Sequence, residues 1–203
     1  MTRVTVMTKF VFDLDGTITT VETLPLLAAE LGLSDEMKLL TDLTLSGQIP
    51  FDKSFKLRYL VLRNVPLKRI QDIMASVALD GQIVDFIAAH KKSCAVVTGN
   101  LDCWIEPIVA KLGCESFSST SELDGSSPVL TKILDKGAAV RELKRTCDRV
   151  IAVGESFNDV PMFEESHVSI AYGGVHKPVA TAISISDYVV FDGGALCRLL
   201  KML

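Results

Sequence analysis

Three short apolar runs, each ending abruptly in polar residues, constrain the fold of this chain more than any other feature of its sequence. The runs are residues 10–12, 94–97 and 150–153. Asp13 and Thr98 follow the first two directly, and Gly154 with Glu155 follows the third. Continuously apolar strands are typical of parallel sheets that helices cover on both faces. Because ligands of such sheets bind beyond the carboxyl ends of the strands, we expect these polar residues to meet at one crevice.

Two weaker runs extend the predicted sheet to five strands, and helical segments are expected between the strands. The weaker runs are residues 168–172 and 188–191, and the helices are expected at residues 82–89, 104–111 and 136–144. The alternation predicts an open α/β fold, in which a mainly parallel sheet is flanked by helices as in a Rossmann-like core.

Residues 18–79 contain no convincing strand and are expected to form an inserted cap of four short helices. These helices are predicted at residues 21–31, 35–46, 51–63 and 67–77. Gly32 and Gly47 follow the first two helices, where glycine commonly ends a helix, and Ser34 precedes the second as its N-cap. The predicted core then consists of residues 1–17 and 80–203.

The composition argues against several classes of partner. The 203-residue chain has a formal net charge of -4, which does not provide the positive field that nucleic-acid binding requires. Its five scattered cysteines indicate neither a disulfide framework nor a zinc site. The first twelve residues, with Arg3 and Lys9, lack the long apolar stretch of a secretory signal, and no segment resembles a membrane span. We therefore expect a cytoplasmic protein that binds neither nucleic acid nor a membrane.

The first polar turn, Asp13-Leu14-Asp15-Gly16-Thr17, carries two carboxylates. Asp13 can act as a nucleophile on a phosphate ester, while Asp15 can protonate the leaving oxygen and later activate water. Gly16 lets the turn close tightly and lets the backbone approach a phosphate. Taken alone, the motif fits an acidic turn or a calcium-binding type of loop as well.

Phosphoryl transfer also requires donors and positive charge around the phosphoryl oxygens. The Thr98 hydroxyl and the Gly99 amide can donate to such an oxygen, although Thr-Gly-Asn is also ordinary turn chemistry. Lys136 stands at an expected helix start, where its charge opposes the helix dipole, which suggests a use other than that of a solvated lysine. Lys132 is the alternative lysine.

The third strand is followed by two acids, Glu155 and Asp159, on either side of Asn158. Together with Asp13 they offer the hard oxygen ligands that Mg²⁺ prefers. Asp159 also stands before Pro161 in the first turn of an expected helix, where it can serve as an N-cap. Four such groups in a fixed order, three of them directly after buried strands, are far more specific together than singly.

These four groups resemble the four motifs of the haloacid dehalogenase superfamily of phosphatases. The groups are Asp13 to Thr17, Thr98 with Gly99, Lys136, and Gly154 to Asp159. The helical insertion resembles the phosphoserine phosphatase branch, and the likeness covers nearly the whole chain. The resemblance implies a magnesium-dependent phosphatase whose substrate is a small phosphorylated metabolite, phosphoserine first among them.

The resemblance also implies a role for each motif residue. Asp13 is the implied nucleophile and Asp15 the acid and base, while Thr98 and Lys136 hold the phosphoryl group. The implied Mg²⁺ ligands are Asp13, the Asp15 carbonyl and Glu155. The family usually has aspartate at this last position, so that Glu155 is a departure that retains the carboxylate.

The phosphoserine phosphatase branch implies further contacts inside the cap. The expected substrate-binding residues are Glu22, Arg58, Thr98, Gly99 and Asn158. Arg58 shares an apolar helical stripe with Phe51 and Phe55, so it either has a buried partner or extends into water at the edge of the cap. Glu22 is equally explained as an acid in the first turn of a helix.

Two other functions use the same residues. A phosphotransferase would pass the phosphoryl group from Asp13 to a small alcohol, such as homoserine, in place of water. A non-catalytic phosphate-binding or regulatory module would follow if Glu155 spoiled the metal site. The joint presence of Asp13, Asp15, Thr98 and Lys136 argues against the second of these alternatives.

Overall fold

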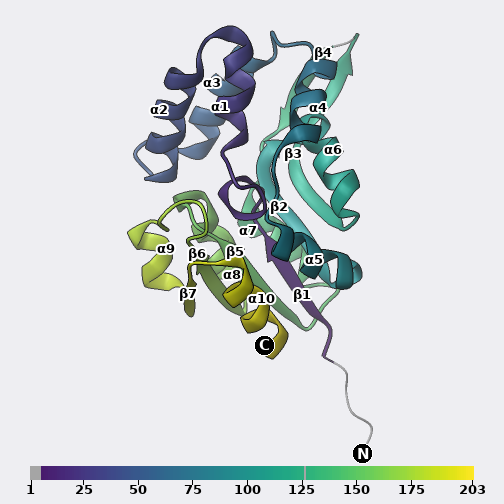
Figure 1. Cartoon of the computed structure of the whole chain (residues 1–203), viewed down its shortest axis with the longest axis vertical. Coiled ribbons are helices and arrows are strands. Elements are labelled where there is room, and N and C mark those ends of the chain that lie inside the picture. Colours follow the sequence, from purple (N-terminus) through teal and green to yellow (C-terminus); the bar gives the residue numbers. More distant parts are fainter. Residues whose placement is uncertain (1–5, 126) are drawn as a thin grey trace, which may run out of the picture.

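The three apolar runs form adjacent parallel strands at the centre of one sheet (Figure 1). They correspond to β1 (Thr8–Phe12), β2 (Cys94–Leu101) and β5 (Arg149–Gly154), with β1 between the other two. The structure is a computed structural model that describes residues 6–125 and 127–203. Residues 1–5 of the amino-terminal segment, which include Arg3, lie outside the described residues.

The sheet contains seven strands in the described residues, in the order β4-β3-β2-β1-β5-β6-β7. The remaining strands are β3 (Glu115–Asp124), β4 (Ser127–Lys132), β6 (Val168–Tyr172) and β7 (Tyr188–Val190). The expectation of five strands was wrong, because β3 and β4 form an additional antiparallel pair at one edge. Most of the residues in these two strands are polar, and more than half of them are exposed, so the pair lacks the long buried apolar run of the central strands. The mainly parallel α/β architecture is confirmed.

Alternate residues of the central strands point to opposite faces of the sheet. Phe12 and Val96 pack on one face under α5 (Gly81–Ala89), α6 (Asp102–Leu112) and α10 (Gly193–Met202). Val11 and Ala95 pack on the other face under α7 (Lys136–Leu143), α8 (Val160–Glu165) and α9 (Ala180–Ile185). Because both faces are covered, the strands are apolar throughout instead of alternating with polar residues.

The predicted insertion is helical. Its helices are α1 (Thr23–Ala28), α2 (Ser34–Leu45), α3 (Phe51–Leu62) and α4 (Leu67–Ser76). Gly32 and Gly47 follow the first two segments with φ values of +68° and +75°, as expected of helix-ending glycines. The N-cap role of Ser34 was wrong, because Ser34 is the first residue of α2 and its hydroxyl donates to the Pro25 carbonyl at 3.4 Å.

The chain enters and leaves the helical insertion through two segments that pair with each other. Thr19 and Leu79 form an antiparallel bridge, and the Asp80 N–H donates to the Ile18 carbonyl at 2.8 Å. In Figure 1, α1, α2 and α3 stand beyond the carboxyl end of β1, while α4 packs along α6. The division into a core of residues 1–17 and 80–203 and a cap of residues 18–79 stays a prediction.

The helices of the described residues include none that is both long and apolar enough to cross a membrane.

Candidate active site

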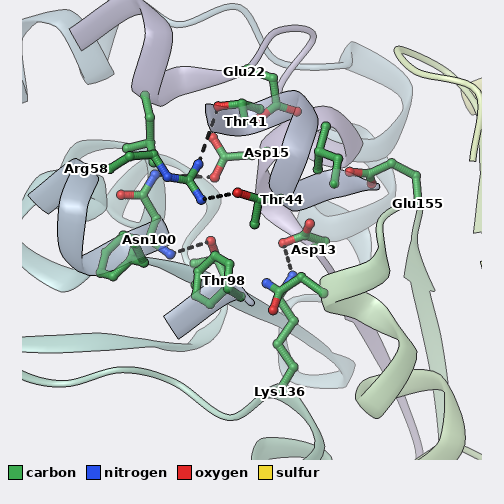
Figure 2. Close-up of a pocket in the computed structure, with 16 residues that line it drawn as sticks. Asp13, Asp15, Glu22, Thr41, Thr44, Arg58, Thr98, Asn100, Lys136 and Glu155 are labelled. Atoms are coloured by element: carbon green, nitrogen blue, oxygen red, sulfur yellow. Dashed lines mark hydrogen bonds and ion pairs between the residues drawn. The ribbon is translucent and has the colours of Figure 1, made fainter. Parts of the chain in front are cut away.

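A single cavity gathers nearly all the residues that the sequence singled out, between the carboxyl ends of the central strands and the inserted helices (Figure 2). The predicted site residues that line it are Asp13, Asp15, Glu22, Arg58, Thr98, Gly99, Lys136, Glu155 and Asn158. Asp159 lies beside it, within an acidic cluster formed with Asp13 and Glu155. Lys132, the alternative lysine, is exposed at the end of β4 and is not among the lining residues.

Asp13 is fixed where β1 ends. Its backbone N–H donates to the Val153 carbonyl of the neighbouring strand at 2.9 Å, and the residue is only 5% exposed. Gly16, with a φ of +74°, lets the chain turn back directly afterwards. Burial and the nearby charge of Asp159 raise the pKa of Asp13 well above its ordinary value, against the opposing effect of the Lys136 ammonium.

Lys136 begins α7, as expected, and its ammonium is buried between two carboxylates. The Nζ atom lies 2.6 Å from Asp13 Oδ1 and 2.7 Å from Asp159 Oδ1. Burial acts to lower the pKa of Lys136, but the charges of Asp13 and Asp159 outweigh it and raise the pKa above its ordinary value. The ammonium therefore stays protonated, and the alternative of a solvated lysine is excluded.

Asp159 holds the turn of the fourth motif in place. Its Oδ2 accepts hydrogen bonds from the N–H groups of Glu155 at 2.9 Å and Ser156 at 2.8 Å, and from the Ser156 hydroxyl at 2.9 Å. The side chain makes no capping bond to α8 and instead completes a capping box with Ser156. Asp159 therefore stands before α8 as expected, but its side chain holds the turn that precedes it and does not cap α8.

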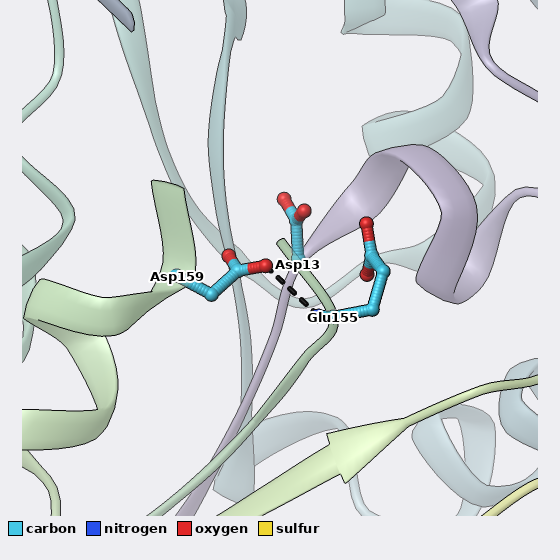
Figure 3. A group of neighbouring side chains, drawn as sticks. All are labelled: Asp13, Glu155 and Asp159. Atoms are coloured by element: carbon cyan, nitrogen blue, oxygen red, sulfur yellow. Dashed lines mark hydrogen bonds between the residues drawn. The ribbon is translucent and has the colours of Figure 1, made fainter. Parts of the chain in front are cut away.

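The acidic cluster of Asp13, Glu155 and Asp159 has more negative charge than its partners balance (Figure 3). The three acids can bring carboxylate oxygens within 4.8 Å of one another, and Lys136 supplies one positive charge against their three negative ones. Glu155 Oε2 accepts from the Thr17 hydroxyl at 2.6 Å, whereas Glu155 Oε1 is buried without a partner among the described residues. Burial and the neighbouring acids raise the pKa of Glu155 well above its ordinary value. Such a site suits a bound cation.

The Asp15 carboxylate points away from this cluster and is held from the cap side of the cavity. Its Oδ1 accepts from the Thr23 N–H at 3.1 Å and from the Thr23 hydroxyl, and its Oδ2 accepts from the Asn100 side chain at 3.3 Å. Asn100 Nδ2 also lies 2.9 Å from Thr23 Oγ1. The side chain of Asp15 is thereby fixed over the cavity, separate from the other acids.

Thr98 and Gly99 bring the end of β2 against the cap. Thr98 is buried, and its hydroxyl oxygen accepts the Asn100 N–H at 3.1 Å. A Cβ at position 99 would overlap the ring of Phe51 from α3, so this close approach of cap and core requires glycine. Asn158 reaches the same cavity from the fourth motif.

Arg58 is buried in the cap, 4% exposed, rather than extended into water at its edge. Its guanidinium lies 3.4 Å from each of the Thr41 and Thr44 hydroxyls and 5.9 Å from the centre of the Phe51 ring. The Nε atom is buried without a partner, and no carboxylate of the described residues forms an ion pair with this side chain. Burial lowers the pKa of Arg58, but a guanidinium stays charged in proteins. The charges of Asp15 and Glu22 act in the opposite direction, but neither acid forms an ion pair with the guanidinium. A buried cation without a paired acid is suited to an anionic ligand.

Glu22 stands directly before α1, but its side chain makes no capping bond to that helix. It lines the cavity and contacts His176 from the loop after β6. The expectation that this acid lies in the first turn of a helix was wrong, because Glu22 precedes α1 and its side chain faces the cavity and His176.

Four further residues position the site and were not identified as functional from the sequence. Thr17 belongs to the first motif, two residues after Asp15, and Asn100 directly follows the second motif, so these places in the sequence were the available signal. Thr23 and His176 carry no signal, because nothing in the local sequence indicates the side chains that they contact.

Curated relatives of similar sequence are phosphoserine phosphatases. The one from Archaeoglobus fulgidus is 27% identical over 186 residues, which are 84% of this chain and 54% of that protein. The one from Methanocaldococcus jannaschii is 25% identical over 177 residues, which are 79% of this chain and 83% of that protein. The chain thus spans about half the length of the first relative and most of the second.

Solved structures share the fold over almost the whole chain. A phosphoserine phosphatase holding an analogue of the phospho-aspartyl intermediate superposes with a TM-score of 0.82 at 20% identity, covering 98% of this chain and 100% of that one. The sequence profile of the haloacid dehalogenase-like hydrolase family matches residues 10–164, from β1 through the fourth motif. With the four motifs gathered at one cavity, this match shows that the chain belongs to the haloacid dehalogenase-like hydrolase family.

Proposed function

We propose that this protein is a Mg²⁺-dependent phosphatase that hydrolyses a small phosphomonoester, with phosphoserine as the leading substrate, through an aspartyl-phosphate on Asp13. The observation that carries the proposal is the buried ion pair of Asp13 and Lys136, which lies beside Glu155 and Asp159 at the floor of a cavity. The similar proteins of Archaeoglobus fulgidus and Methanocaldococcus jannaschii are phosphoserine phosphatases, which supports the proposal.

In the first half of this reaction, an Asp13 oxygen attacks phosphorus and the bond from phosphorus to the ester oxygen breaks. Asp15 donates its proton to the departing alkoxide, for which its fixed position over the cavity suits it. The Lys136 ammonium and the Thr98 hydroxyl stabilise the charge on the phosphoryl oxygens. In the second half, Asp15 takes a proton from water, which attacks phosphorus and releases phosphate from Asp13.

The donor set at the acidic cluster fits a magnesium ion. The unpartnered Oε1 of Glu155 and the excess negative charge both call for a cation with oxygen ligands. Asp13, Glu155 and the Asp15 carbonyl would hold it, with Asp159 completing the cluster while its oxygens also hold Lys136 and the turn. When bound, Mg²⁺ lets the carboxylate nucleophile and the negative phosphate approach each other.

The cap residues support an amino-acid-like substrate. Arg58, buried without an ion-pair partner in the described residues, is suited to pair with a carboxylate through two parallel hydrogen bonds. Glu22, on the same cavity, is suited to bind an ammonium group. Phosphoserine carries both groups.

The cytoplasmic location expected from the sequence stays a prediction.

The test is a screen of phosphorylated metabolites with Mg²⁺ and after chelation, followed by trapping of the phosphoenzyme. Labelled phosphoserine, quenched in acid, should leave a protein-bound phosphate that hydroxylamine removes, as expected of an acyl phosphate. Asp13→Asn should abolish both the label and turnover, because an amide is a far weaker nucleophile. A variant that retains more than about a hundredth of the wild-type rate would contradict the covalent mechanism.

Added alcohols separate hydrolysis from phosphotransfer. Inorganic phosphate should remain the product when homoserine or another small alcohol is present in excess. A new phosphate ester would instead assign the protein as a phosphotransferase.

A further inference from the structure

His176 links the loop after β6 to the start of the cap. Its Nε2 lies 3.1 Å from Oε1 of Glu22, a residue 154 positions away in sequence. The loop of residues 173–179 is anchored at both ends, because the Gly173 N–H donates to the Val190 carbonyl at 2.7 Å and the Val179 N–H to the Glu155 carbonyl at 3.0 Å. His176 is therefore held in a defined place against Glu22.

The contact lies at the boundary between the cavity and the solvent. The His176 side chain is 38% exposed and that of Glu22 is 17% exposed. The Glu22 side chain does not cap α1, and His176 is its hydrogen-bond partner in the described part of the chain. An ionised carboxylate can only accept hydrogen bonds, so in the state with Glu22 charged the Nε2 atom of His176 carries the hydrogen.

The surroundings of Glu22 make this hydrogen bond important. Burial raises the pKa of Glu22 above its ordinary value, while the hydrogen bond from His176 acts in the opposite direction. The charge of Asp15 adds to the rise, and that of Arg58 opposes it. Loss of the His176 donor would therefore favour the neutral acid, which binds an ammonium group poorly.

We propose that His176 is a positioning residue that holds the Glu22 carboxylate charged and directed at the cavity, so that Glu22 can recognise an ammonium group on the substrate. The inference rests on the proposed function, in which Glu22 binds the amine of an amino-acid phosphate. It adds a residue outside the four motifs and outside the cap, and it makes substrate choice depend on a contact between cap and core.

Kinetics on two matched substrates test the proposal. The pair is phosphoserine and the phosphate ester of hydroxypropanoate that differs only in lacking the ammonium group. His176→Ala should raise KM for phosphoserine about tenfold with kcat nearly unchanged, the scale of one lost hydrogen bond to a charged group. KM for the amine-free ester should not change. His176→Gln, whose amide can donate to Glu22, should restore much of the loss, and Lys177→Ala in the same loop is the matched control.

The outcomes separate this inference from the proposed function. Equal KM increases on both substrates, or no increase on either, would overturn the role of His176 while leaving the phosphatase proposal intact. A wild-type protein that hydrolyses no phosphate ester would contradict the proposed function itself. Hydrolysis of both esters with the same KM would overturn the ammonium role of Glu22 and this inference with it.

A titration that needs no substrate checks the contact independently. The His176 ring can be followed by NMR in the full chain, wild type against Glu22→Gln, with Asp42 and Lys38 of α2 as the other charged groups that act on it. The hydrogen bond to Glu22 raises the pKa of His176, so that this pKa should fall in Glu22→Gln. An unchanged value would show that the two side chains do not interact in solution, and the inference would fail.

Discussion

At the scale of single residues, the site depends on a few buried charges that balance one another. Lys136 satisfies Asp13 and Asp159 at once, and Asp159 in turn holds the backbone that carries Glu155. Removing one member of such a group leaves another charge buried without a partner, which costs more than the lost contact alone. Substitutions at this site should therefore have large effects on activity and stability. Which property changes should depend on what the substituted atom contacts.

Glu155→Gln should weaken magnesium binding. The amide keeps the shape of the side chain but loses the negative charge, so we expect the Mg²⁺ concentration for half-maximal activity to rise about tenfold or more. Calorimetric titration with Mg²⁺ measures the same change without turnover. Glu164→Gln, an exposed acid on α8, is the matched control and should leave both titrations as they are. An unaltered titration in Glu155→Gln would mean that this acid is not a ligand.

Arg58→Ala should impair hydrolysis of phosphoserine far more than that of p-nitrophenyl phosphate, which has no carboxylate. The expected loss of kcat/KM for phosphoserine corresponds to about 2 to 4 kcal/mol of transition-state binding, the range for a buried charged hydrogen-bonded pair. Arg63→Ala, at the exposed residue directly after α3 and over the Tyr59 ring, controls for loss of a nearby arginine. If kcat/KM falls equally for both substrates, Arg58 supports the structure of the cap and does not bind the substrate carboxylate.

At the scale of secondary-structure elements, the cap and the core meet through close backbone contacts. The ring of Phe51 on α3 lies against Gly99 on β2, and the ring of Phe157 lies against Gly47 at the end of α2. In both places a Cβ would overlap the aromatic ring. These contacts set how far the cap residues stand from the catalytic turns, so small changes in them should alter activity.

Gly99→Ala should move α3 away from the core and lower kcat/KM by about tenfold or more, since a displacement near 1 Å can cost two orders of magnitude in rate. Phe51→Ala in the same background should recover part of the activity by making room for the added methyl group. Gly81→Ala is the control, because a Cβ there has nothing within 4 Å. Wild-type rates in Gly99→Ala would show that activity does not depend on this close contact between cap and core.

At the scale of the whole molecule, the acidic cluster couples stability to pH and to metal. Glu155 has a folded-state pKa well above its ordinary value of 4.5, so the folded protein binds this proton more tightly than the unfolded chain. Its contribution to stability is present below 4.5 and is lost as pH rises through the folded-state pKa. Asp13 acts in the same direction.

The metal-free protein should consequently melt at a lower temperature at about pH 8 than at about pH 5, and Mg²⁺ should raise Tm more at the higher pH. Scanning calorimetry with and without chelator measures both effects. Glu155→Gln should flatten the pH dependence, because it removes one of the shifted groups. A Tm that is independent of pH in the metal-free wild type would contradict the charge excess inferred for the cluster.

The sequence by itself determined the central strands, the helical insertion and the four motifs. These features are local, since an apolar run or a helix-ending glycine acts within a few residues of itself. The rule that parallel strands present their carboxyl ends at one edge then brought Asp13, Thr98 and Glu155 together, although they are far apart in the chain. No further information was needed to place them at one cavity.

The tertiary structure alone decided which partner each polar group has. The burial of Arg58 against Thr41 and Thr44, the hydrogen bonds of Asp159 and the contact between Glu22 and His176 depend on how separate elements pack. The β3–β4 pair was likewise invisible in the sequence, because an edge hairpin needs no continuous apolar run. Hydrogen bonds between residues as far apart as Glu22 and His176 leave no local pattern, so that only the folded chain reveals them.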